Sequence, residues 1–131
     1  MRGLKRVETF YDKAKTIIKE RYYIDEKELI QGLYELFFAD GQLDERCTLK
    51  DDKINGFYEF FYENNQVSER YTYKNGLRHG LYESFYEDDQ LEKKGTYKND
   101  KLHGVFKKFN RDGQLIERCT YKNGLIEGLY E

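Results

Sequence analysis

The sequence predicts an all-β protein, an elongated single-layer antiparallel sheet of stacked 24-residue β-hairpin repeats. Three observations predict it: glycines recur every 24 residues, each interval holds two strand-like and two turn-like segments, and much of the hydrophobic class consists of Tyr and Phe. A unit of this kind cannot bury its apolar side chains alone, so each hairpin must pack on its neighbours.

The repeat is marked by five glycines, each followed by an apolar and then an aromatic residue: Gly32, Gly56, Gly80, Gly104 and Gly128. Within each unit a phenylalanine, a glutamine and a threonine also keep the 24-residue interval, as Phe37, Gln42 and Thr48 do in the first. We therefore expect residues 32–131 to form four full repeats and a terminal half repeat.

Each unit is predicted to form a strand, a turn, a second strand and a second turn. The pairs that close the first turn are Asp40-Gly41, Asn64-Asn65, Asp88-Asp89 and Asp112-Gly113, and those that close the second are Asp51-Asp52, Asn75-Gly76, Asn99-Asp100 and Asn123-Gly124. These residue types tolerate the positive φ values of tight hairpin turns. With strands about 4.8 Å apart, the stack should lengthen by roughly 9.5 Å per repeat.

Residues 1–31 depart from the period. The segments Val7–Asp12 and Ile18–Tyr23 resemble Tyr82–Glu87 and Leu115–Thr120, which predicts a degenerate N-terminal capping repeat. The alternative is an amphipathic helix, because Leu4, Val7, Tyr11, Ala14 and Ile18 recur at helical spacing.

The sequence given ends partway through a fifth unit, at Gly128–Glu131. A half repeat that ends on an aromatic strand leaves a sheet edge unpaired. We expect this strand to close the stack or to pair with another chain, for instance as a homodimer through the C-terminal edge strand.

The composition limits the classes of function that we expect. The chain has 23 basic and 25 acidic residues, interleaved along the sequence, and a net charge of −2. With no basic run, we expect no nucleic-acid binding and no membrane association. No apolar stretch of signal-peptide or membrane-spanning length is present, which predicts a cytoplasmic protein.

The run Tyr-Lys-Asn-Gly-Leu-x-x-Gly-Leu-Tyr-Glu, as at residues 73–83, followed by an aromatic pair and an Asp-Gly-Gln-Leu type turn, resembles the MORN repeat (membrane occupation and recognition nexus). It is similar in particular to the bacterial variant of the YwqK family, labelled an antitoxin component. The resemblance is strong over residues 32–131 and weak over residues 7–31. It implies stacked hairpins in a long antiparallel sheet, whereas function does not follow from fold.

Residues able to carry chemistry are few. Cys47 and Cys119 share a repeat position and should lie roughly 28 Å apart, too far for a disulfide. His79 and His103, one repeat apart, should lie near 9.5 Å from each other, too far for a two-histidine metal site. We predict no metal site and no cofactor.

Three glutamates, Glu35, Glu59 and Glu83, recur at one position and have the spacing of a glycosidase pair. Repetition alone produces that spacing, so it carries no catalytic information. Lys107 stands at the same position in the fourth unit, where we expect it to pair across strands with Glu83. The sequence predicts no catalytic residue and no enzyme.

One row of aromatic residues remains: Tyr34, Tyr58, Tyr82, Phe106 and Tyr130. Their first role should be packing between repeats, and aligned rings are also anchors that protein interfaces favour. The sequence therefore predicts a non-catalytic protein-interaction module for an unidentified protein partner, with the antitoxin-like component of a bacterial toxin–antitoxin pair as its specific form. The alternative is a peripheral phospholipid-binding protein.

Overall fold

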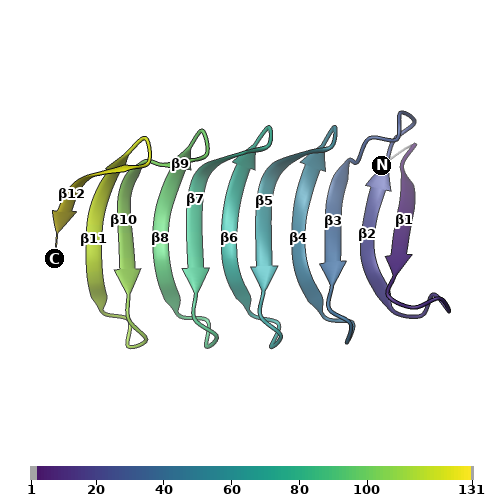
Figure 1. Cartoon of the computed structure of the whole chain (residues 1–131), viewed down its shortest axis with the longest axis horizontal. Coiled ribbons are helices and arrows are strands. Elements are labelled where there is room, and N and C mark those ends of the chain that lie inside the picture. Colours follow the sequence, from purple (N-terminus) through teal and green to yellow (C-terminus); the bar gives the residue numbers. More distant parts are fainter. Residues whose placement is uncertain (1–2, 131) are drawn as a thin grey trace.

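The computed structural model describes the backbone of residues 3–130 and the side chains of residues 3–127. It is one open antiparallel sheet in which the strands lie side by side in chain order, from β1 at one end to β12 at the other (Figure 1). The exception is the two-residue β9, which pairs with β8 but does not separate it from β10. The strands are β1 (Lys5–Phe10), β2 (Ile18–Ile24), β3 (Gly32–Phe37), β4 (Leu43–Lys50), β5 (Lys53–Phe61), β6 (Val67–Lys74), β7 (Leu77–Phe85), β8 (Leu91–Lys98), β9 (Lys101–Leu102), β10 (Gly104–Phe109), β11 (Leu115–Lys122) and β12 (Leu125–Tyr130). The predicted fold class is confirmed.

The turns after β4, β6, β8 and β11 are two-residue hairpin turns. Both central residues have positive φ, for example 50° at Asn75 and 87° at Gly76. This is the type I′ geometry, whose twist matches that of paired strands. The second residue of each turn also donates its N–H to the preceding unit, as Gly76 does to the Ile54 carbonyl at 2.8 Å. Each turn is thereby bonded to backbone of the preceding unit.

At the opposite end of the strands the turns are longer. Tyr62 donates its N–H to the Gln66 carbonyl, and Asn65 closes the turn with a φ of 71°. The sequence predicted a pair of turn residues at each of these turns, and in each pair only the second residue has a positive φ. A one-residue bulge follows in the next strand, where Val67 and Glu69 pair with Phe61 and Phe60.

Tyrosine hydroxyl groups join the units at the same end. The Tyr62 hydroxyl donates to the Phe85 carbonyl at 2.6 Å, and the Tyr86 hydroxyl donates to the Phe109 carbonyl at 2.6 Å. Each bond crosses from one unit to the next, so these hairpins are joined to a neighbour at this end of the strands as well.

The N-terminal segment forms a hairpin of β1 and β2. Its register slips at Phe10, in the same place as in later units, and the Tyr11 hydroxyl donates to the Phe37 carbonyl at 2.6 Å. The helical alternative for this segment is wrong, because residues 3–130 contain no helix. Within this described part of the chain, no helix is long and apolar enough to cross a membrane.

The repeated glycine and threonine meet across two strands. Gly56 has a φ of 112°, and a Cβ atom there would lie 2.4 Å from the Thr48 hydroxyl oxygen. That hydroxyl donates to the Asn55 carbonyl at 2.6 Å. Only glycine combines this φ with so close an approach. The contact recurs at Gly104, where a Cβ atom would lie 3.0 Å from the Thr96 hydroxyl oxygen, and is looser at Gly80, where the nearest Thr72 atom would lie at 3.4 Å.

We predict that Gly56→Ala lowers the free energy of unfolding by about 3 kcal/mol, because it adds backbone strain to a collision with Thr48. Gly32→Ala is the matched control, since Gly32 also has positive φ (82°) but nothing within 4 Å of its missing Cβ. That control should lose only about 1 kcal/mol. Urea unfolding followed by circular dichroism measures both, and equal losses would contradict the role given to Thr48.

Candidate interaction surface

The two faces of the sheet differ in character. Successive side chains along a strand point to opposite faces, so each repeat position belongs to one face only. We call the face that carries Tyr34, Tyr58, Tyr82 and Phe106 the aromatic face, and the face that carries Glu35, Glu59 and Glu83 the ladder face.

On the aromatic face the rings pack against one another along the sheet. The Tyr82 ring lies 4.7 Å from the Tyr71 ring and 6.4 Å from the Phe106 ring, centroid to centroid. Phe106 also covers Gly95, where a Cβ atom would come within 2.6 Å of the ring. Tyr82 and Phe106 are only 7% and 8% exposed. This row is therefore the packing core of the sheet.

Carboxylates border the same face and accept hydrogen bonds from its tyrosines. Tyr34 donates to Glu20, Tyr58 to Glu45, and Tyr71 to Glu69 at 2.9 Å. Burial, followed by the hydrogen bond to Glu45, raises the pKa of Tyr58 above its usual value. These hydroxyl groups therefore stay protonated and act as donors.

The predicted partner-binding residues are thus placed as follows. Tyr34, Tyr58, Tyr82 and Phe106 lie on one face in one row, and the side chain of Tyr130 lies outside the described residues. Because Tyr82 and Phe106 are buried, they offer little area to a partner. Partner binding by this row stays a prediction.

The two cysteines fill the same row. Both are free thiols, and Cys47 and Cys119 are 4% and 0% exposed. Burial, with Glu45 nearby, raises the pKa of Cys47 to about 11, which makes its reactive thiolate scarce at neutral pH. Within residues 3–127, no group of three or more His, Cys, Asp or Glu side chains is placed to hold a metal ion.

The ladder face carries a row of charged residues that oppose one another strand by strand. We call it the charge ladder; from β1 to β11 it consists of Glu8, Arg21, Glu35, Arg46, Glu59, Arg70, Glu83, Lys94, Lys107 and Arg118. From Glu8 to Lys94 the sign of the charge alternates at every step. Opposite charges on directly opposed residues stabilise a sheet.

Glu59 is the central member of the charge ladder. Arg46 and Arg70 donate to its two oxygens through Nε, at 2.7 and 2.8 Å, and the residue is 5% exposed. Burial alone would raise the pKa of Glu59, but the hydrogen bonds from the two arginines outweigh it and hold the pKa below its usual value. Glu59 is therefore a fixed, buried carboxylate.

Phenylalanine rings hold the arginines in place. The Arg46 guanidinium lies 5.7 Å from the Phe57 ring centroid and 5.4 Å from that of Phe61. Arg70 lies 5.8 Å from the Phe85 ring in the same manner. Each of these guanidinium groups therefore makes both a cation–π contact and an ion pair. The two kinds of contact together hold the positive charges of Arg46 and Arg70 in defined positions.

Among the side chains of residues 3–127, the alternation of charge is broken at β10. Lys107 opposes Lys94 on one side and Arg118 on the other. The predicted pairing of Lys107 with Glu83 is wrong, because β8 lies between them and Glu83 opposes Lys94 instead. The three cations border a shallow hollow of about 240 Å³, which Leu81 and Val105 also line.

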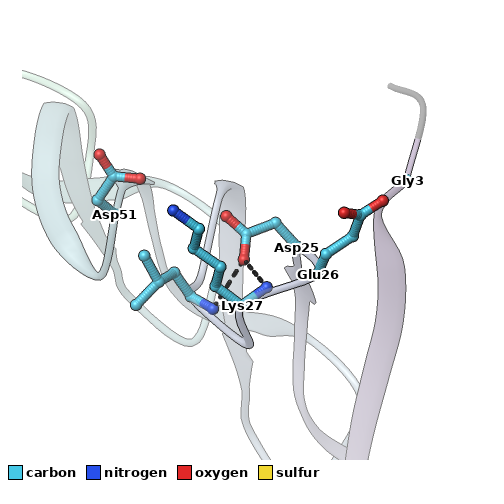
Figure 2. A pocket seen from close by; sticks show the side chains of 6 residues that line it. Gly3, Asp25, Glu26, Lys27 and Asp51 are labelled. Atoms are coloured by element: carbon cyan, nitrogen blue, oxygen red, sulfur yellow. Dashed lines mark hydrogen bonds between the residues drawn. The ribbon is translucent and has the colours of Figure 1, made fainter.

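A second hollow, of about 400 Å³, lies at the N-terminal end of the sheet beside Asp25, Lys27 and Asp51 (Figure 2). Asp25 accepts hydrogen bonds from the backbone N–H groups of Lys27 and Leu29, at 2.9 and 3.0 Å, drawn in Figure 2 as dashed lines. Gln31 donates to Asp25 and to Asp51. These carboxylates shape the turns, which accounts for their clustering.

An open antiparallel sheet in which each hairpin contacts only its neighbours defines a repeat protein. The kind of repeat is shown by the sequence comparison: residues 55–75, 78–99 and 102–123 each match the family model described as the MORN repeat variant. The chain therefore contains three MORN-variant repeats. No curated protein matches this sequence.

Two solved structures are similar to part of the chain. One is a mutant of S. aureus TarM in complex with Fondaparinux, alpha-GlcNAc-glycerol and UDP, with 17% identity and a TM-score of 0.41 over 75% of this chain. The other is TarM, with 17% identity and a TM-score of 0.39 over 72% of this chain. This chain spans 21% of the length of either TarM chain. TM-scores this low support no inference about function.

We predict that Glu59→Gln lowers the free energy of unfolding by about 2 kcal/mol at pH 7, because two charge-assisted hydrogen bonds are weakened. The pKa of Glu59 is lower in the folded than in the unfolded chain, so its stabilising contribution is present above about pH 4.3 and is lost as the pH falls through the folded value. Urea unfolding at pH 7 and pH 3 tests this.

The difference between the wild type and Glu59→Gln should shrink at pH 3. Glu63→Gln is the control, since Glu63 is exposed beside a turn, and it should change stability by less than about 0.5 kcal/mol at either pH. A difference for Glu59→Gln that stays constant with pH would show that the lost interaction is not ionic.

Proposed function

We propose that the protein is a non-catalytic interaction module that binds another protein through the ladder face. The observation that supports this most directly is the contrast between the two faces. On the aromatic face, the rings pack against one another and are largely buried. The ladder face is more open to solvent, because it carries the partly exposed side chains of Arg46, Arg70 and Leu81.

The ladder face also has the rigidity that favours binding. Its arginines are held by carboxylates and by phenylalanine rings, so little side-chain freedom remains to be lost when a partner binds. Side-chain ordering costs about 0.5–1.5 kcal/mol for each long side chain immobilised at an interface. A surface ordered before binding avoids much of that cost.

The glutamates of the charge ladder are poor candidates for acid–base catalysis. A carboxylate pair that cleaves glycosidic bonds needs one member with a raised pKa, so that it stays protonated and can donate. The pKa of Glu59 is lowered by Arg46 and Arg70, and an arginine stands between it and either neighbouring glutamate. This supports a structural role for the glutamates of the charge ladder.

Within this proposal, the specific form suggested by the sequence resemblance is an antitoxin-like component whose partner is a toxin. The alternative function is peripheral phospholipid binding, for which Lys94, Lys107 and Arg118 provide a group of neighbouring cations on the ladder face. Flotation with vesicles that contain anionic lipid at physiological salt separates the two, and we expect the protein to stay unbound.

A photo-crosslinking amino acid placed in the full chain at Leu81 tests the proposed face. Leu81 is 41% exposed on the ladder face. In extracts of the native host, we expect this variant to form one dominant protein adduct, because the partner covers this face. Lys93 on the aromatic face of neighbouring β8 is the matched position and should give no such adduct. Mass spectrometry identifies the adduct.

An adduct at position 93 and none at position 81 would contradict the choice of face. Adducts at neither position would contradict the interaction function itself.

A further inference from the structure

We infer that β1 is an interaction edge for a second copy of this chain, and that the two β1 strands pair antiparallel with Val7 of each copy on a two-fold axis. This inference goes beyond the proposed function and does not depend on it, because it concerns the edge of the sheet and not a partner that covers a face. The observations behind it are the direction of the outer backbone groups of β1 and the charges beside them.

β1 is the end of the sheet and has the form of a pairing strand. Within residues 3–130, β2 is the only strand that pairs with β1. The slip in their register comes from an extra residue on β2, Lys19, so β1 itself runs from Lys5 to Phe10 without a bulge. The chain contains no proline. Bulges and prolines are two of the devices that keep an edge strand from pairing, and β1 has neither.

The backbone groups that β1 presents at the edge belong to Arg6 and Glu8. The Tyr23 carbonyl accepts a hydrogen bond from the Gln31 N–H at 2.9 Å, so the backbone groups of Tyr23 point away from β1. Arg6 is opposite Tyr23. In an antiparallel pair, opposed residues either bond to each other or both point away, and the two kinds of pair alternate. Arg6 and, two residues on, Glu8 therefore point their N–H and C=O groups outward.

The side chains of these two residues have opposite charges and lie together on the ladder face. Arg6 is exposed. Glu8 is the first member of the charge ladder and has a cation opposite it on one side only, where Arg21 lies 3.7 Å away. The side chain of Glu8 is 24% exposed, against 15% for Glu35, which is opposed by an arginine on both sides. A cation from outside the chain would complete the pattern at Glu8.

A second copy supplies that cation in one register. With the two Val7 residues opposed, Arg6 of each copy opposes Glu8 of the other, and these are the residues whose backbone groups point outward. The neighbouring registers that keep this hydrogen bonding shift one copy by two residues. They place Arg6 opposite Arg6, or Glu8 opposite Glu8, and like charges directly opposed are destabilising. The charges thus select a second copy and fix its position.

The C-terminal edge is a poorer match for β1. β1 and β12 run in the same direction (Figure 1), so a head-to-tail contact that keeps both aromatic faces on one side would pair parallel strands. Every strand pair within residues 3–130 is antiparallel. Two β1 strands related by a two-fold axis perpendicular to the sheet are antiparallel, and both ladder faces then lie on the same side.

The first test is sedimentation velocity of the full chain from about 5 to about 500 µM. One edge strand contributes much less than the roughly 800 Å² per partner of a standard interface, so we expect a dimer with a dissociation constant of about 10–100 µM. A chain that stays monomeric up to about 500 µM would overturn the inference.

Arg6→Glu is the decisive variant, because it turns both opposed pairs into like charges. We expect it to weaken the dimer at least about tenfold, which corresponds to about 1.4 kcal/mol. Lys5→Glu is the matched control: it makes the same charge change one residue away, on the aromatic face, and should alter the dissociation constant by less than about threefold. Equal weakening in the two variants, or a dimer unchanged in Arg6→Glu, would overturn the assignment to this edge.

Mixing two variants distinguishes pairing from a loss of fold. In Glu8→Arg the opposed charges are again alike, so this variant alone should also be monomeric. When Arg6→Glu and Glu8→Arg are mixed, every opposed pair has opposite charges, and we expect a heterodimer about as tight as the wild-type dimer. Two well-folded variants that stay monomeric when mixed would contradict the register.

A disulfide tests the register without a change of charge. An opposed pair that is not hydrogen-bonded has a Cα separation of about 4.5 Å, which a disulfide can bridge, so Val7→Cys should form a covalent dimer under mild oxidation. Lys5→Cys is the control, since its two Cα atoms would lie four residues apart along the strands, roughly 13 Å. Cys47 and Cys119 are 4% and 0% exposed and should not compete. Equal crosslinking of the two variants would overturn the proposed pairing.

Discussion

Strand register is the constraint on which the rest of this structure depends. Turns with fixed positive φ values and the contact of Gly56 with Thr48 determine which residues oppose one another. Because the units have equal length, a residue type that recurs in the sequence becomes a row across the sheet. The rings of the aromatic face and the charges of the ladder face are two such rows, and neither would form if the strands slipped by one residue.

A single-layer sheet has no second layer to cover its faces, so each face is stabilised within itself. On the aromatic face, Cys47, Tyr82, Phe106 and Cys119 are buried by their neighbours in the same row. On the ladder face, burial reaches Glu59, and only because two arginines neutralise it. The first arrangement leaves little apolar area to offer, while the second leaves cations and aliphatic side chains at the surface.

The sequence predicted the fold well because the period fixes it: the interval from Gly32 to Gly128 predicted the hairpins, and the likeness of Val7–Asp12 to Tyr82–Glu87 favoured strands over a helix. The proposed interaction surface was harder to predict. Lys94, Lys107 and Arg118 are separated by 13 and 11 residues, so no basic run is visible, and the expected pairing of Lys107 with Glu83 missed the strand between them. Which residues lie next to each other on neighbouring strands follows from the strand register, and the spacing of residues in the sequence predicts that register only approximately. The sequence signal for a break in the charge ladder was the lysine at position 107, where the other repeats have a glutamate.

The alternation of the charge ladder bears on how such an array can change in length. Each interior unit supplies one carboxylate strand and one cation strand, so duplication or loss of a whole unit between β2 and β8 leaves every carboxylate flanked by two cations. The unit of β10 and β11 lacks this property, since it supplies Lys107 and Arg118. A copy of it inserted upstream would bring further like charges together. Interior units are therefore interchangeable modules, whereas the C-terminal unit is tied to its place in the array.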